Sequence, residues 1–192
     1  MADLNREIVG SWITSIGTII AAIGSTPKMY KSFSRCNYDE LSDDLKFLGN
    51  ALQGIGNSVE ASEEEPDSLE KGGNLIQTSG NVAVLFSLTT TNDVTAIKLD
   101  ITGNLLQALG GLIAAFQAFV DNTPGERLDA IGNILQVIGN STQAVGGLAD
   151  LQDLEDDKRF LEFIGSWIQA VGAIICTFAA QLETSTIDLP VK

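Results

Sequence analysis

A short motif with glycine at both ends occurs six times in the chain and restricts its fold more than any other feature. Each copy reads Gly, Asn or Ser, any residue, Leu or Ile, and then Gln, which is replaced by Thr14 in the first copy. The copies are GSWITSIG from Gly10, GNALQGIG from Gly49, GNLIQTSG from Gly73, GNLLQALG from Gly103, GNILQVIG from Gly132 and GSWIQAVG from Gly165. Self-similarity at this spacing predicts a repeat architecture with one element in each copy.

The spacing of apolar residues indicates that these elements are helices. Gly-Asn pairs usually mark turns, and a seven-residue spacing of glycines also fits a β-solenoid. However, Leu106, Leu109, Ile113 and Phe116 follow one another at intervals of three and four residues, which is helical spacing. Turn and cap signals lie at 25–27, 63–68, 89–93 and 121–126.

We therefore predict an all-α fold, a six-helix antiparallel bundle or layered helical array built from Gly-heptad repeats. Residues 1–192 would form a single helical repeat domain with an acidic linker at 63–67. The expected helices cover about 3–25, 39–62, 68–90, 93–120, 126–149 and 156–184. Short connections make sequence neighbours antiparallel.

On a helical wheel, Leu and Ile gather on one side of each motif, and Gly, Asn and Gln lie on the other. A glycine inside a helix costs about 1 kcal/mol relative to alanine, so the repeated glycines need a compensating contact. Close approach of another backbone supplies one, and we interpret the glycine side as a second contact face. The residues predicted for helix packing or assembly are Gly10, Trp12, Gly17, Gly103, Gly110, Gly132, Gly139, Gly165, Trp167 and Gly172. The amides predicted to bond between helices are Gln53, Gln77, Gln107, Gln136 and Gln169.

Charged residues are missing from five long stretches, 8–27, 72–92, 101–120, 130–149 and 163–182. About 20 residues is the length that spans a bilayer. The stretches are diluted with polar residues, mean hydropathy is only +0.17, and no basic flank orients them, which disfavours a constitutive polytopic membrane protein. Two interpretations remain: the polar strips are buried against other helices, or the helices are soluble in one state and line a pore in another.

Composition argues against most other functions. A net charge of −14 disfavours nucleic acid as a partner, and the absence of histidine removes the commonest general base and metal ligand. The acidic clusters lack the spacing of a calcium loop, and no nucleophile motif is present. We predict no catalytic residue, no metal and no cofactor, and hence no enzyme. Cys36 and Cys176 are interpreted as a free thiol and a small buried side chain.

The first and last copies resemble each other most, since both carry Trp and use Ser in place of Asn. Their helices could pair within one chain, which would close a bundle, or between chains, which would build a ring or filament. We expect pairing between chains, so that the partner is the protein itself. The N-terminus carries Asp3 and Glu7 where a secretory signal would be basic, which predicts a cytoplasmic or a spore- or cell-surface location without a Sec signal.

With its copies GNALQGIGN, GNILQVIGN and GSWIQAVGAIIC, the chain resembles a family of uncharacterised repetitive proteins from spore-forming Gram-positive bacteria. The resemblance covers about residues 8 to 180, implies a bacterial origin and carries over no functional residue. Our first hypothesis is a self-assembling structural or interaction protein that uses glycine-lined helix faces. The alternative is a membrane-active protein, pore-forming or lipid-inserting, with the Gln and Asn strip facing the lumen.

Overall fold

The structure, a computed structural model, describes residues 2–29 and 38–187, and these residues contain six α-helices and no strand. The helices are α1 (Ala2–Met29), α2 (Tyr38–Glu63), α3 (Leu69–Thr89), α4 (Asp93–Asp121), α5 (Pro124–Asp150) and α6 (Glu155–Ile187). The predictions of an all-α fold and of six helices are confirmed. Cys36 lies outside the described residues.

Most helix ends lie where capping chemistry predicts them. The side chains of Ser68, Asn92 and Thr123 accept hydrogen bonds from the backbone N–H groups at the starts of α3, α4 and α5. The predicted end of the first helix at residue 25 is wrong, because α1 continues past Pro27 to Met29. A proline so close to the end of a helix removes only one N–H donor, so it does not have to end the helix there.

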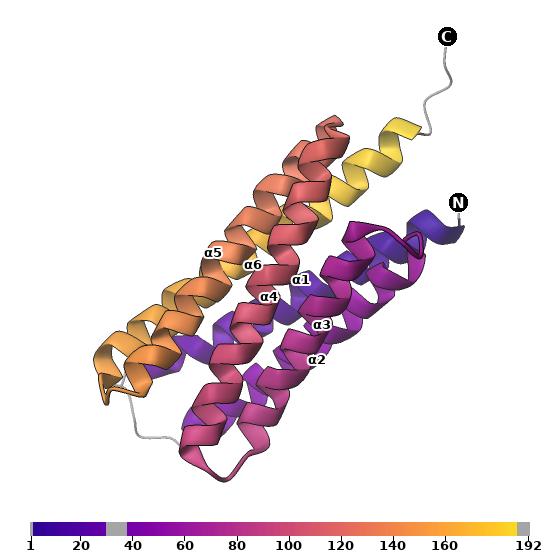
Figure 1. Ribbon diagram of the computed structural model, residues 1–192. Coiled ribbons are helices and arrows are strands. Elements are labelled where there is room, and N and C mark those ends of the chain that lie inside the picture. Colours follow the sequence, from indigo (N-terminus) through magenta and orange to yellow (C-terminus); the bar gives the residue numbers. More distant parts are fainter. Residues whose placement is uncertain (1, 30–37, 188–192) are drawn as a thin grey trace.

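The six helices follow one another around a closed ring (Figure 1). Each helix packs against its neighbours in sequence, and α1 also packs against α6. Hydroxyl pairs join that last seam, with 2.6 Å between the Oγ atom of Ser15 and Oγ1 of Thr177 and 2.6 Å between the Oγ atoms of Ser25 and Ser166. The terminal helices therefore meet within one chain rather than between chains, contrary to the expectation from the sequence.

Glycines bring the helices together in three antiparallel pairs. In the α5–α6 pair, a Cβ atom added to Gly132 would lie 2.7 Å from the carbonyl oxygen of Gly172, and one added to Gly139 would lie 2.6 Å from that of Gly165. Reciprocal contacts of the same kind join α1 to α2 and α3 to α4. They pair Gly10 with Gly56, Gly17 with Gly49, Gly73 with Gly110 and Gly80 with Gly103. Only glycine permits two helix backbones to approach this closely.

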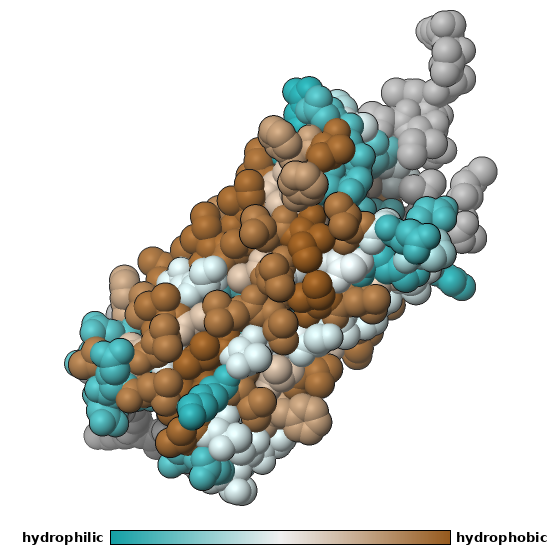
Figure 2. All heavy atoms as spheres, viewed as in Figure 1, coloured by the Kyte–Doolittle hydropathy of each residue, from teal (hydrophilic) through white to brown (hydrophobic). Residues whose placement is uncertain are grey.

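Polar and small side chains fill the inside of the ring, and large apolar side chains cover its outside. Among the described residues, Val84 is the only buried hydrophobic residue larger than alanine. Large apolar residues are exposed on every helix, for example Ile16, Ile55, Leu109 and Ile138, each 47–53% exposed. Figure 2 shows hydrophobic residues covering the middle of the visible face, with hydrophilic residues at its two ends. The apolar stripe of each helix, which we expected to form one of two contact faces, remains about half exposed along much of its length.

Three helices are long and apolar enough to cross a membrane, judged by length and composition alone. The segments are Arg6–Thr26, Asp93–Asp121 and Glu155–Thr184. The other three helices carry more polar residues in their spans. Many of those polar residues, among them Asn57, Asn81 and Asn140, are buried, so they lower the mean hydropathy of a helix without adding polar surface to its outer face.

Candidate functional site

A column of amide side chains runs along the axis of the ring. At its centre, α2, α4 and α6 each contribute the Gln of their motif, Gln53, Gln107 and Gln169. The Nε2 atom of Gln169 donates to Oε1 of Gln53 at 2.8 Å and to Oε1 of Gln107 at 3.1 Å. All three side chains are at most 5% exposed. This glutamine triad joins one helix of every pair and closes the axis.

The equivalent residues of α1, α3 and α5 form a second layer, displaced toward one end of the ring. Thr14, Gln77 and Gln136 line a common cavity of about 40 Å³. The Nε2 atom of Gln136 donates to Sγ of Cys176 at 3.4 Å, and Oγ1 of Thr14 donates to Oε1 of Glu60 at 3.0 Å. By contrast, the Gln77 amide is 5% exposed and bonds to no side chain or backbone group of the described residues. The cavity is thus polar and has room for a few water molecules.

A charged residue lies three positions before the first glycine of every motif copy, and these residues form one layer at each end of the axis. Glu7, Glu70 and Asp129 come from α1, α3 and α5, and Lys46, Asp100 and Glu162 come from α2, α4 and α6. Each layer lines a cavity of its own. We call the first the acidic layer and the second the lysine layer.

The acidic layer opens into a cavity of about 50 Å³ that is rich in carboxylates. Its lining includes Glu7, Glu60, Glu64, Glu70, Glu126, Asp129 and Glu183. Burial, together with repulsion from Glu64, raises the pKa of Glu70 to about 9. Burial and then repulsion from Asp129 raise the pKa of Glu126 to about 7. Burial also raises the pKa of Asp129 to about 6, against hydrogen bonds from Cys176 and Asn133 that lower it.

The lysine layer has a cation within it. The Nζ atom of Lys46 donates to Oε2 of Glu162 at 2.9 Å, and the two side chains are only 17% and 8% exposed. Asp100 lines the same cavity, of about 20 Å³. The ammonium group of Lys46 therefore lies in a small polar chamber with two carboxylates, where a partner is needed to offset the cost of burying charge.

The structure places the residues predicted from the sequence in two locations. All eight predicted glycines lie at the contacts between paired helices of the same chain, α1 with α2, α3 with α4 and α5 with α6. All five predicted glutamines are buried along the axis, and their observed bonds run between helices for Gln53, Gln107, Gln136 and Gln169.

The two tryptophans lie on the outside of the α1–α6 seam. The ring of Trp12 meets that of Phe178 edge to face at 6.5 Å, and Nε1 of Trp167 donates to Oγ1 of Thr26 at 3.1 Å. The tryptophans are 41% and 37% exposed. They therefore report on the medium that surrounds the ring.

Sequence reasoning missed the two charged layers. Their signal was present, since a charged residue at the same distance before each copy is a periodic feature that extends the motif. Within the described residues, no group of three His, Cys, Asp or Glu side chains is arranged to hold a metal ion. The side chains along the axis present amide and carboxylate oxygens to the cavities that they line.

The family of unknown function DUF6944 matches residues 5–177. No curated protein matches the chain. No solved structure matches it either.

Proposed function

The chain belongs to the DUF6944 family, which carries no functional assignment, and we propose from its geometry that it is a membrane-embedded, pore-type protein. In this proposal the ring lies in a bilayer with its apolar surface against lipid and its polar axis across the membrane. The single observation that carries the proposal is the inverted packing, with large apolar side chains outside and amides inside. The proposal assigns no catalytic step to the protein.

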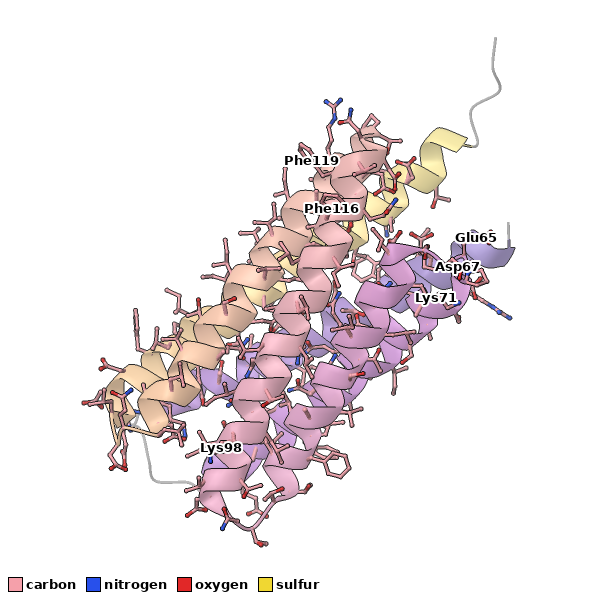
Figure 3. All side chains as sticks on the ribbon, in the orientation of Figure 1. Glu65, Asp67, Lys71, Lys98, Phe116 and Phe119 are labelled. Carbon is pink, nitrogen blue, oxygen red and sulfur yellow. The ribbon has the colours of Figure 1, made fainter. Side chains whose placement is uncertain are left out.

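The exposed apolar area of the outer surface favours contact with lipid over contact with water. Soluble monomers seldom expose contiguous apolar patches larger than a few hundred Å². Here exposed apolar residues occur on all six helices, among them Phe116 at 60% and Phe119 at 74% on α4 (Figure 3). Burying a fully exposed side chain of this kind is worth about 1.5–3 kcal/mol, and covering the exposed half of one is worth about half as much. A bilayer covers all of them at once.

The interior has the composition expected of helices packed in lipid. Helix contacts in membranes use small residues that let backbones approach closely, as the paired glycines do here. Ionisable residues in such proteins face the interior of the bundle, as do Lys46 and Glu162. We propose that the Gly-heptad repeat is what allows six helices to form a ring around an axis this narrow.

The hydrogen-bonded glutamine triad supports a state in which the axis is closed to the passage of polar solutes. Gln53, Gln107 and Gln169 line the cavity of about 20 Å³ and are joined by the hydrogen bonds between their amides, and the cavity of about 40 Å³ shares no lining residue with it. A path for small polar solutes would require those bonds to break. If the resemblance to proteins of spore-forming Gram-positive bacteria holds, the membrane concerned is bacterial.

The two tryptophans provide the test. The protein is reconstituted into liposomes whose lipids carry bromine on their acyl chains, and tryptophan fluorescence is compared with that in unbrominated liposomes. We expect brominated lipid to quench both residues, since both side chains face outward, whereas aqueous iodide should quench them weakly. Strong quenching by iodide with none by brominated lipid would contradict the proposal.

Self-assembly is the second candidate, and one observation favours it. A groove of about 520 Å³ between α2 and α3 is lined by Ile55, Val82 and Leu85 together with small residues, a shape that can receive side chains of a second copy. Copies that pack side by side in water would bury the same outer surface. This proposal predicts large particles in buffer without detergent, visible by electron microscopy. The membrane proposal predicts instead a discrete species in detergent.

A further inference from the structure

The two ends of the axis are built from equivalent positions but differ in charge. Both layers take their residues from three positions before the motif glycine. In the lysine layer, Lys46 supplies a cation next to the carboxylates of Glu162 and Asp100. In the acidic layer all three positions are carboxylates, and no ion pair joins Glu7, Glu70 or Asp129 to a lysine or arginine among the described residues.

Two amide side chains next to the acidic layer can accept hydrogen bonds through their oxygen atoms. Gln77 and Asn74 line the cavity that Glu70 and Asp129 also line. Each is 5% exposed, and neither side chain has a hydrogen-bond partner among the described residues. Because both amides line the cavity, their oxygen atoms can accept hydrogen bonds from an occupant that carries N–H donors.

We propose that the acidic layer and its adjoining cavity bind an ammonium-type cation, ammonium itself or the head group of a small primary amine. The charge and the donors of Lys46 in the equivalent layer indicate the chemistry. An ammonium group has N–H donors for carboxylate and amide oxygens at ordinary hydrogen-bond distances, and it needs no compact set of ligands. The cavities of about 50 and 40 Å³ suit a group of this size.

The inference goes beyond the proposed function, because it concerns the axis and holds whether or not the outer surface faces lipid. The carboxyl groups favour a cation once they have lost their protons. Since burial raises the pKa of Glu70 to about 9, the site should bind more tightly at pH 9 than at pH 6.

The test measures the unfolding temperature of the full chain in detergent at pH 8.5, as ammonium chloride replaces tetramethylammonium chloride at constant ionic strength. Tetramethylammonium has the same charge but no N–H donor. We expect a saturable rise in unfolding temperature with ammonium, and at least a tenfold weaker apparent affinity in Glu70→Gln and in Asp129→Asn. Glu65→Gln, at the exposed α2–α3 connection (Figure 3), should respond as the wild type does.

Three results would overturn the proposal. They are a rise that does not saturate, an equal response to potassium, or an unchanged response in the Glu70 and Asp129 variants. Should either variant fail to fold, calorimetric titration of the wild-type protein with ammonium chloride decides, and an absence of binding heat at every concentration refutes the site. In Lys46→Met, which removes the internal ammonium group, the proposal predicts a second saturable ammonium response that wild type lacks.

Discussion

Replacing Gly139 by alanine tests whether close backbone contact holds the helix pairs together. A Cβ atom at this position would lie 2.6 Å from the backbone nitrogen of Gln169 and 2.6 Å from the carbonyl oxygen of Gly165. Ordinary contact begins at 3.4 Å, and neither atom belongs to a side chain that could rotate away. The α5–α6 pair would have to separate locally, and such overpacking costs about 1–3 kcal/mol.

Helix propensity acts in the opposite direction, and a second glycine isolates it. Alanine is favoured over glycine in a helix by about 0.5–1 kcal/mol, so Gly139→Ala should lose up to about 2.5 kcal/mol net. Gly72 also lies in a helix, but a Cβ atom there would meet nothing within 4 Å. Gly72→Ala should therefore gain about 0.5–1 kcal/mol.

Thermal unfolding followed by circular dichroism measures both variants. For a chain of this size, 1 kcal/mol corresponds to about 2–4 °C, so Gly139→Ala should melt up to about 10 °C below the wild type and Gly72→Ala about 1–4 °C above it. If Gly139→Ala melted as high as Gly72→Ala, close contact would not be the role of the motif glycines, and the reasoning would be refuted.

Four further predictions concern other parts of the ring. Gln169→Leu should destabilise the protein by about 1–3 kcal/mol in denaturant titrations, because it leaves Gln53 and Gln107 without their donor, whereas Gln152→Leu in the exposed α5–α6 connection should change little. Asn140→Leu should stabilise by about 1–3 kcal/mol, since both polar atoms of this buried amide have no partner among the described residues; a lower unfolding midpoint would contradict this. Leu109→Arg on the outer face of α4 should reduce membrane insertion, at about 2.5–3.5 kcal/mol near the bilayer centre, while Leu151→Arg in a connection should insert normally; flotation with liposomes compares them. Because the folded-state pKa of Glu70 is raised, its contribution to stability is complete below about pH 4.5 and lost as pH rises to about 9; melting curves over that range should decline in the wild type and decline less in Glu70→Gln.

The helices themselves could be predicted from the sequence to within a few residues. Their apolar spacing and the caps at Ser68, Asn92 and Thr123 are local properties that act through contacts a few residues apart. Pro27 misled the prediction because its effect depends on how soon the helix ends after it.

The orientation of each helix could not be predicted. A helix with a Gly-Asn-Gln face and a Leu-Ile face can bury either one, and the outcome depends on the surrounding solvent. Averaged hydropathy conceals the distinction, because the polar residues that lower it point toward the axis. Ring closure through Ser15 and Thr177 is likewise a contact between the two ends of the chain, and no local pattern reports it.

The equivalence of the three helix pairs has a consequence for the evolution of the axis. Were the same ring assembled from three identical hairpins, symmetry would place every side chain on the axis in triplicate. A single lysine at position 46, or a single thiol at Cys176, would then be impossible, since each would bring two copies of itself. Joining the hairpins in one polypeptide removes that restriction. One hairpin can acquire a charge or a reactive group by point mutation, while the other two retain the residues that close the ring.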